Sequence, residues 1–200
     1  LPSRERLAGM CARIGAARVL PPEVKQVIEQ LAGRTSPMST LRTVVSALGH
    51  YESNVPLKEL PPKALRLVGQ IAAAVAMIHR LREGQAPIEA NPERGHAADF
   101  LHMLLGREVT ETQAQALDLY LILLADHGFN ASTFSGRVTA GTLANLHSAI
   151  TSSVGTLSGP LHGGANEKAM EMIIKVGSPD NAAEWVAERI AAKKRIMAVS

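Results

Sequence analysis

The chain has 200 residues, of which 46% are apolar, 20% are charged and 3% are aromatic, and its formal net charge is +3. This composition is typical of a globular domain and excludes a disordered chain, while sparse aromatic rings and the lack of a dense basic run argue against a nucleic-acid partner. The single cysteine, Cys11, excludes a disulfide framework and a cysteine-rich zinc site, which fits a reducing compartment.

Membrane insertion is not expected from the apolar runs. The longest cover residues 71–78 and 119–125 and are far shorter than the ~20 residues that a membrane span needs. The opening residues, LPSRER, are charged, lack the apolar stretch of a signal peptide and do not start with methionine. We therefore expect a cytoplasmic protein with no membrane partner, and a sequence cut from a longer chain.

Helical periodicity runs through almost the whole sequence, and no alternating run is long enough to predict a strand. Thr110 and Gln113 have the spacing of a capping box, in which the hydroxyl accepts from a backbone amide and the glutamine reaches back. Prolines suited to a first helical turn and glycines suited to a helix end delimit the other helices. In chain order, we expect helices at 4–18, 22–32, 37–48, 62–83, 95–105, 111–126, 138–154, 165–176 and 179–196, a Pro-rich loop at 85–94 and a polar interruption at 127–137. The predicted fold class is all-α.

Two of these helices are apolar on nearly all sides, at residues 64–79 and 117–126. Such helices must be covered either by the core of their own domain or by another subunit. After Gly164 the chain becomes more charged and amphipathic, as expected for a thinner layer. We therefore predict a domain boundary there, between residues 1–164 and 165–200.

His162 lies in the segment SGPLHGGAN (158–166), just before a predicted helix. The positive end of a helix macrodipole disfavours a protonated imidazole, and a neutral ring can donate a hydrogen bond to a developing enolate oxygen, as a histidine does in triosephosphate isomerase. Gly163 and Gly164 have no side chains, so a thioester or a phosphate could approach main-chain amides. The alternative is a glycine turn between packed helices with an incidental histidine.

His127 lies in the segment DHGFNAST (126–133), at the end of an apolar helix. Asn130, Ser132 and Thr133 add donors and acceptors around it. The alternative is a helix end at Gly128 followed by an Asn/Ser cap. No GxSxG motif supports a Ser-His-Asp hydrolase, and no HExxH or CxxC pattern supports a metal site, so we expect no metal.

Five segments resemble the citrate synthases, including the closely related 2-methylcitrate synthases, in the order and at the spacing of that family. The segments are SPMSTLRTVVSALG (36–49), HRLREGQAPIEANPERGHAADFLHMLLG (79–106), DHGFNASTF (126–134), LHSAITSSVGTLSGPLHGGANEKAMEMI (146–173) and AAKKRIM (191–197). The resemblance implies an all-helical fold in which residues 1–164 are a portion of the large domain and residues 165–200 begin the small, mobile domain. It also implies a homodimer held by a sandwich of helices, which would cover the two apolar helices.

The reaction implied by the resemblance is a carbon–carbon condensation. Acetyl-CoA loses a methyl proton, the enolate attacks the keto carbon of oxaloacetate, and hydrolysis of the thioester releases citrate and CoA. No resident cofactor is implied, because coenzyme A arrives as the substrate thioester. Propionyl-CoA as the donor, giving 2-methylcitrate, is the alternative within the family.

The resemblance also assigns residues. His162 matches the catalytic histidine that stabilises the enolate, and His127 matches a histidine that binds oxaloacetate. Substrate-binding positions nearby match as well: Asn130 and Ser132 in the oxaloacetate loop, and Gly163, Gly164 and Asn166 at the thioester end of CoA.

Other parts of the family pattern are not found in this sequence. In the family, a segment like KKRIM continues into GFGHR, which supplies a second histidine, and the aspartate base and the carboxylate-binding arginines follow later. A thioester methyl group needs a positioned base as well as enolate stabilisation, so we expect these 200 residues to be inactive alone. The chain is then either a portion of a working enzyme or a non-catalytic remnant that serves as a dimerisation or CoA-sensing module.

Overall fold

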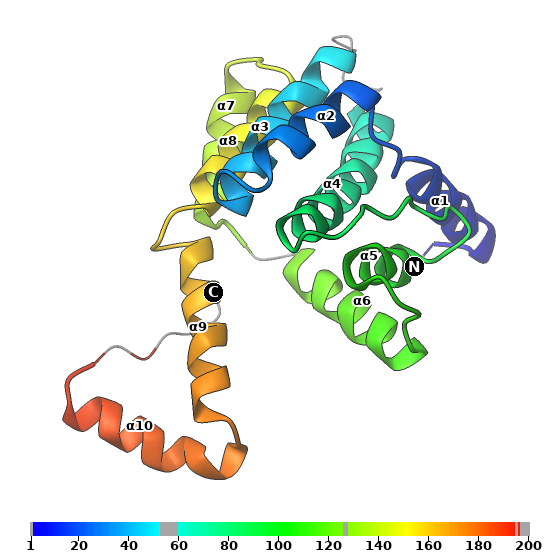
Figure 1. Cartoon of the computed structure of the whole chain (residues 1–200). Coiled ribbons are helices and arrows are strands. Elements are labelled where there is room, and N and C mark those ends of the chain that lie inside the picture. Colours follow the sequence, from blue (N-terminus) through cyan, green and yellow to red (C-terminus); the bar gives the residue numbers. More distant parts are fainter. Residues whose placement is uncertain (1, 53–59, 126–127, 195, 197–200) are drawn as a thin grey trace. The chain divides into compact units, whose positions relative to one another are not determined.

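The computed structural model describes residues 2–52, 60–125, 128–194 and 196. Within these ranges the chain is helical and contains no strand, which confirms the all-α prediction (Figure 1). The α-helices are α1 (Arg4–Ala16), α2 (Pro22–Leu31), α3 (Pro37–Leu48), α4 (Leu60–Arg82), α5 (His96–Leu105), α6 (Glu111–Ala125), α7 (Ala131–Gly141), α8 (Leu146–Leu157), α9 (Gly163–Val176) and α10 (Ala182–Ala191). Short 3₁₀ turns follow α3 at Gly49–Tyr51 and precede α10 at Pro179–Asn181.

The chain divides into two compact units, Leu1–Val154 and Gly155–Ser200. The division falls inside α8, whereas the sequence predicted a boundary after Gly164. Helix α9 and helix α10 form the second unit together with the last turn of α8. Whether the two units correspond to the large and small domains stays a prediction.

Helix α4 is the centre of the first unit, where it contacts α1, α2, α3 and α5. Its buried Ala74, Ala76 and Ile78 pack into a core with Ile28 of α2 and with residues of α3 and α5: Val44, Val45, Leu48 and Met103. The core of the first unit therefore covers one side of this apolar helix. By length and composition alone α4 could cross a membrane, but half of its most apolar window is buried, as in the core helix of a globular domain.

Two local predictions, a capping box and a polar interruption, can be compared with the structure. The capping box at the start of α6 is confirmed, because the Thr110 amide donates to Gln113 Oε1 over 3.1 Å and the Gln113 amide donates to Thr110 Oγ1 over 3.3 Å. The polar interruption predicted at 127–137 is wrong, because α7 begins at Ala131. Asn130 caps it, with Oδ1 accepting from the Thr133 amide at 2.9 Å.

The predicted helix at 138–154 is also wrong, since residues 138–141 belong to α7, residues 146–154 belong to α8, and residues 142–145 lie between the two helices. The break is at Leu143, whose φ of 64° is left-handed and incompatible with a continuous helix. Asn145 then starts α8 by accepting a hydrogen bond from the Ser148 amide at 2.9 Å. The predicted helix at 179–196 begins instead as the 3₁₀ turn, and α10 ends at Ala191.

A buried ion pair joins three parts of the first unit. Arg18, just after α1, pairs with Asp99 of α5, and the two residues are 2% and 0% exposed. The Arg18 guanidinium also donates to the carbonyl oxygens of Asn91 (3.1 Å) and Arg94 (3.0 Å), and the Asn91 amide donates to Asp99 Oδ1 (3.1 Å). The pair thus fixes the Pro-rich loop against α1 and α5.

Gly15 provides a test of this packing. A Cβ built there would lie 2.3 Å from the carbonyl oxygen of Pro92, which is backbone and cannot rotate away. We expect Gly15→Ala to lower the free energy of unfolding by about 1–3 kcal/mol, as overpacked cores do. Urea denaturation of the 200-residue chain measures this change.

Gly9 is the matched control in the same helix. No atom lies within 4 Å of a Cβ built there, so Gly9→Ala should stabilise the chain by about 0.5–1 kcal/mol through helix propensity. Equal effects of the two substitutions would contradict the close approach of α1 to the loop.

Candidate functional site

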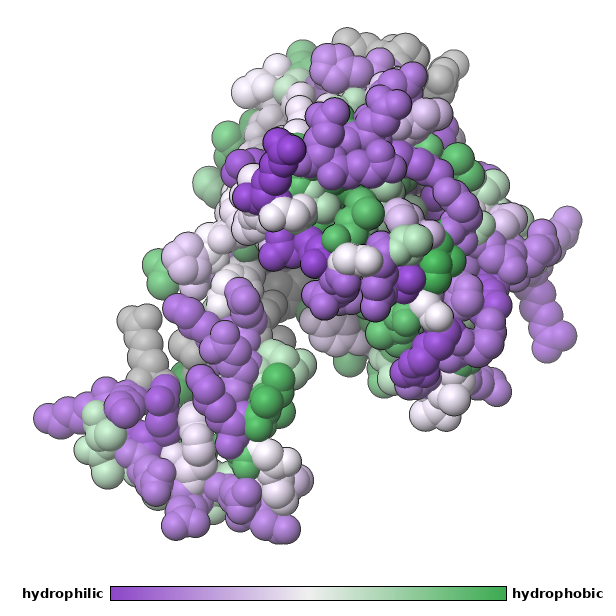
Figure 2. Space-filling view, viewed as in Figure 1, coloured by the Kyte–Doolittle hydropathy of each residue, from purple (hydrophilic) through white to green (hydrophobic). Residues whose placement is uncertain are grey.

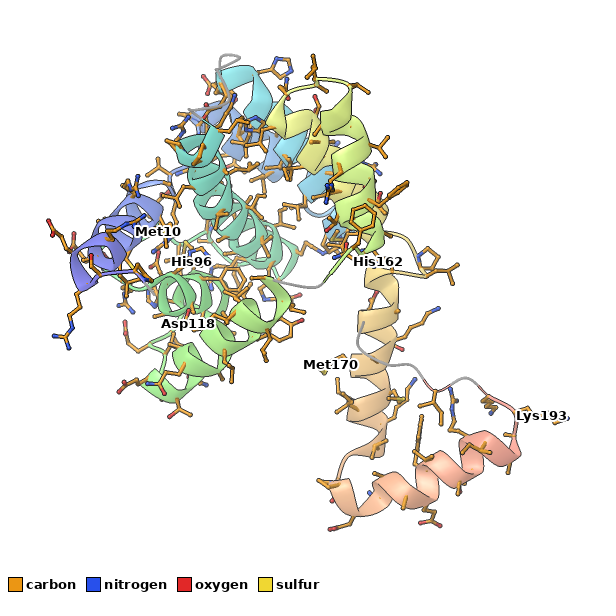
Figure 3. The ribbon with its side chains drawn as sticks, turned by 180° about the vertical axis from the view of Figure 1, so that it is seen from behind. Met10, His96, Asp118, His162, Met170 and Lys193 are labelled. Atoms are coloured by element: carbon orange, nitrogen blue, oxygen red, sulfur yellow. The ribbon has the colours of Figure 1, made fainter. Side chains whose placement is uncertain are left out.

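His162 occupies the N-cap position of α9, between the end of α8 and the first helical residue, Gly163 (Figure 3). Its φ and ψ of −128° and −102° are not helical, and its side chain is half-buried. The turn is held by main-chain bonds, in which the His162 amide donates to Gly159 O over 3.0 Å and His162 O accepts from the Ala165 amide over 2.9 Å. A residue in this position lies at the positive end of the α9 dipole, as the sequence predicts.

Of the glycine pair after His162, Gly163 leaves no room for a side chain and Gly164 leaves little. A Cβ on Gly163 would lie 2.2 Å from the carbonyl oxygen of Leu157, and one on Gly164 would lie 3.3 Å from the carbonyl oxygen of Gly159. The backbone at the end of α8 therefore lies close to the first turn of α9 at Gly163. The role of these glycines at a thioester stays a prediction.

Asn130 and Ser132 both have structural partners at the start of α7. Asn130 caps the helix, and Ser132 Oγ donates to the carbonyl oxygen of Ser153 on α8 over 3.1 Å. In return, Ser153 Oγ donates to the carbonyl oxygen of Ser132 over 2.9 Å. This reciprocal pair fixes α7 against α8, so both predicted substrate-binding residues help to shape the groove that they line.

The groove between α7 and α8 has a volume of about 370 Å³ and is lined by Asn130, Ser132, Thr133, Gly136, Arg137, Ala140, Ala149, Ile150 and Ser153. Arg137 is the cation of this lining, and its guanidinium lies 5.2 Å from the centre of the Phe129 ring. Sequence reasoning missed Arg137. The available signal was its isolation, because no other lysine or arginine occurs between Arg107 and Lys168.

The predicted site residues are divided between the two units of the chain. Asn130 and Ser132 belong to the first unit, whereas His162, Gly163 and Gly164 belong to the second. Asn166 lies in α9, and His127 lies outside the described residues. In the described ranges, no group of three or more His, Cys, Asp or Glu residues is arranged to hold a metal ion.

Two histidines outside the predicted site have a lowered pKa. His147, at the start of α8, is 3% exposed; burial lowers its pKa below the usual value of about 6.5, and the positive charge of Lys63 adds to this effect more than Glu52 opposes it. Burial, followed by the charge of Arg18, lowers the pKa of His96 at the start of α5.

The lowered pKa values of His147 and His96 predict how the stability of the fold depends on pH. The unfolded chain binds a proton on each histidine at a higher pH than the folded chain does, so stability is lost as the pH falls through about 6.5. Each histidine contributes at most about 1.4 kcal/mol per pH unit in that window. We expect a lower free energy of unfolding at pH 5.5 than at pH 7.5, and a smaller decrease in His147→Gln, both measured by urea denaturation. Equal stability of the wild-type chain at the two pH values would contradict this prediction.

The sequence matches one protein family along almost its whole length. The family model described as citrate synthase, C-terminal domain, matches residues 1–199. Citrate synthase of Deinococcus radiodurans is 38% identical over 204 residues, which cover 100% of this chain and 54% of the relative. A 2-methylcitrate synthase of Mycobacterium tuberculosis is 38% identical over 199 residues, which cover 98% of this chain and 50% of the relative.

Solved structures agree with these relatives. Citrate synthase from Pyrobaculum aerophilum has a TM-score of 0.83 at 35% identity, covering 92% of this chain and 49% of that chain. A ternary complex of carboxymethyl coenzyme A and oxaloacetate with citrate synthase from Thermoplasma acidophilum has a TM-score of 0.87 at 28% identity. The match covers 98% of this chain and 52% of that chain. The chain thus spans about half the length of the curated relatives it matches.

Proposed function

Because the chain belongs to the citrate synthase family, we propose that it forms part of an enzyme that condenses acetyl-CoA with oxaloacetate to give citrate and CoA. The observation that carries this proposal is the place of His162, half-buried at the N-terminus of α9 in the segment GPLHGGAN. The imidazole of a histidine in this position can donate a hydrogen bond to a developing oxyanion.

The proposed chemistry uses that hydrogen bond when negative charge appears. A carboxylate base removes a methyl proton from acetyl-CoA, and the electron pair moves to the thioester oxygen, where the His162 ring donates. The enolate carbon then forms a bond to the keto carbon of oxaloacetate, whose oxygen takes up a proton. Water finally cleaves the thioester, so that CoA leaves as a thiol. No resident cofactor takes part in this scheme.

The donor substrate is the second part of the proposal. Both citrate synthases and 2-methylcitrate synthases occur among the relatives at 38% identity, so acetyl-CoA and propionyl-CoA are the two candidates. We propose acetyl-CoA. Release of free thiol from each donor in the presence of oxaloacetate tests this choice, in a family-length polypeptide that contains these residues.

The outcomes of this assay are distinct. A kcat/KM at least tenfold higher for acetyl-CoA would support a citrate synthase, and the reverse ratio would favour 2-methylcitrate. If neither donor released thiol, the proposed enzymatic activity would be overturned and a non-catalytic remnant would be favoured.

Helix α6 supports a homodimer. It contains most of the segment 117–126 that is apolar on nearly all sides, yet none of the 15 residues of α6 is buried, and Ile122 and Leu123 are 68% and 66% exposed. Consecutive residues of a helix point in different directions, so the exposed run at 119–123 surrounds much of the helix. Exposed apolar areas of this kind mark interfaces. We propose that a second copy of the chain covers α6.

Ile122→Glu tests the dimer. A buried carboxylate without a partner is costly, so we expect the variant to be monomeric where the wild-type chain has twice the monomer mass. Light scattering after size-exclusion chromatography measures the mass. Ile174→Glu is the matched control, because Ile174 is 70% exposed and lies on α9 in the second unit. A monomeric wild-type chain, or dissociation by both variants, would contradict an interface centred on α6.

A further inference from the structure

The second unit contains a pocket of about 480 Å³ between α9 and α10. Its wall is formed by Pro160, Leu161, Ala165, Lys168, Glu171, Met172, Lys175, Trp185 and Arg189. Pockets that hold small molecules in proteins have volumes of about 300–1,000 Å³, so this pocket is of ligand size. His162 and the groove of the first unit do not contribute to its lining.

Helix periodicity explains which residues line the pocket. On α9, Ala165, Lys168, Met172 and Lys175 are three or four residues apart and share one face of the helix. Trp185 and Arg189 are four residues apart on α10 and share the facing side. Lys168 and Lys175 are separated by two turns of the helix. The α9 wall of the pocket therefore carries two lysines on one face, about 10 Å apart along the helix axis.

The charge of the lining is positive, with Lys168, Lys175 and Arg189 against Glu171 alone. Lys175 Nζ lies 3.8 Å from Glu171 Oε2, but both side chains are well exposed and such a pair contributes little. Lys168 makes no hydrogen bond or ion pair with the residues that the structure describes. Its charge therefore remains available to an anionic ligand.

Part of the pocket wall is apolar. Met172 lies between Lys168 and Lys175 along α9, Trp185 lines the α10 side, and both are half-buried. The guanidinium of Arg189 lies 5.0 Å from the centre of the Trp185 ring. In the space-filling view, the apolar side chains visible on α9 lie on its edge away from α10, outside this pocket (Figure 2). An aromatic or aliphatic body can contact Met172 and Trp185 while its charged ends reach the lysines.

We propose that this pocket binds an elongated organic dianion, whose apolar body lies on Met172 and Trp185 and whose anionic groups pair with Lys168 and Lys175. A compact inorganic anion leaves the apolar wall uncovered and reaches only one lysine at a time. A ligand with one anionic end forms only one of the two ion pairs. The pocket therefore selects for both length and charge.

The test uses biphenyl-4,4′-dicarboxylate, a rigid apolar rod with a carboxylate at each end. Titration calorimetry of the 200-residue chain measures the affinity, and the fluorescence of Trp185 reports on the pocket itself, because it is the only tryptophan in the chain. Biphenyl-4-carboxylate and inorganic phosphate serve as the one-charge and charge-only comparisons. We expect the dicarboxylate to bind at least ~10-fold more tightly than either, which corresponds to one good ion pair.

Two double variants distinguish binding in the pocket from nonspecific attraction to positive charge. Lys168→Gln with Lys175→Gln should weaken the dicarboxylate at least ~10-fold. Lys193→Gln with Lys194→Gln removes the same charge after α10, outside the pocket lining, and should change the affinity less than twofold (Figure 3). Circular dichroism confirms that both double variants keep their helices.

The proposal is overturned if the wild-type chain does not bind the dicarboxylate at millimolar concentration. It is also overturned if both double variants lose affinity equally, or if inorganic phosphate or the monocarboxylate binds as tightly. Binding that is lost only in the pocket variant, with a matching loss of the Trp185 fluorescence change, supports it.

Discussion

Replacing His162 by alanine in a family-length polypeptide is expected to lower kcat at least ~100-fold, the usual cost of removing one donor to a developing oxyanion. The reason is the place of this side chain at the start of α9, where the imidazole can donate a hydrogen bond to the enolate oxygen. Because the hydrogen bond forms in the transition state, kcat should fall much more than KM changes. Thiol release with acetyl-CoA and oxaloacetate measures both constants.

His79→Ala is the matched control for this substitution. His79 is exposed on α4 in the other unit, so its loss should leave kcat within twofold of the wild-type value. Unfolding midpoints of both variants show whether the loss of activity comes from a loss of fold. A decrease of less than tenfold in His162→Ala would contradict the proposed role.

Removing Asp99 is expected to have the largest effect on stability. Asp99→Ala leaves Arg18, which is 2% exposed, without its countercharge, and removes the acceptor of the Asn91 amide. Breaking a buried pair on one side costs about 3–5 kcal/mol, because the remaining charge stays desolvated. We expect the free energy of unfolding of the 200-residue chain to fall by that amount in urea denaturation.

The exposed pair Lys25–Glu89 provides the comparison. Its atoms lie 2.6 Å apart, but Glu89 is 79% exposed, so Glu89→Ala should cost at most about 1 kcal/mol. If Asp99→Ala cost no more than Glu89→Ala, the buried pair would not hold the loop between α1 and α5.

Local signals in the sequence predicted most of the helices. The capping box at Thr110 and Gln113 forms as the spacing indicates, and prolines 22 and 37 begin α2 and α3. Helix α7 was missed because its polar residues resemble a loop. Helix α7 does not depend on an apolar face alone, because hydrogen bonds between Ser132 of α7 and Ser153 of α8 join the two helices. Such pairing between distant segments has no local signal in the sequence.

The candidate site was predicted unevenly for the same reason. His162 could be placed at a helix N-terminus because the glycine pair and the helical pattern after it are local features. The close approach of Gly163 to Leu157, and the place of Arg137 in the groove of α7 and α8, depend on how helices pack. A single sequence does not encode those distances in any short pattern.

The isolation of Arg137 has a practical consequence for tryptic digestion. Trypsin cleaves after lysine and arginine, so between Arg107 and Lys168 its one cleavage site is the peptide bond after Arg137. That bond lies inside α7, and a protease needs an extended segment, so α7 must unwind locally before it is cut. The rate at which the peptide bond after Arg137 is cut, followed by mass spectrometry, therefore reports the opening of this one helix.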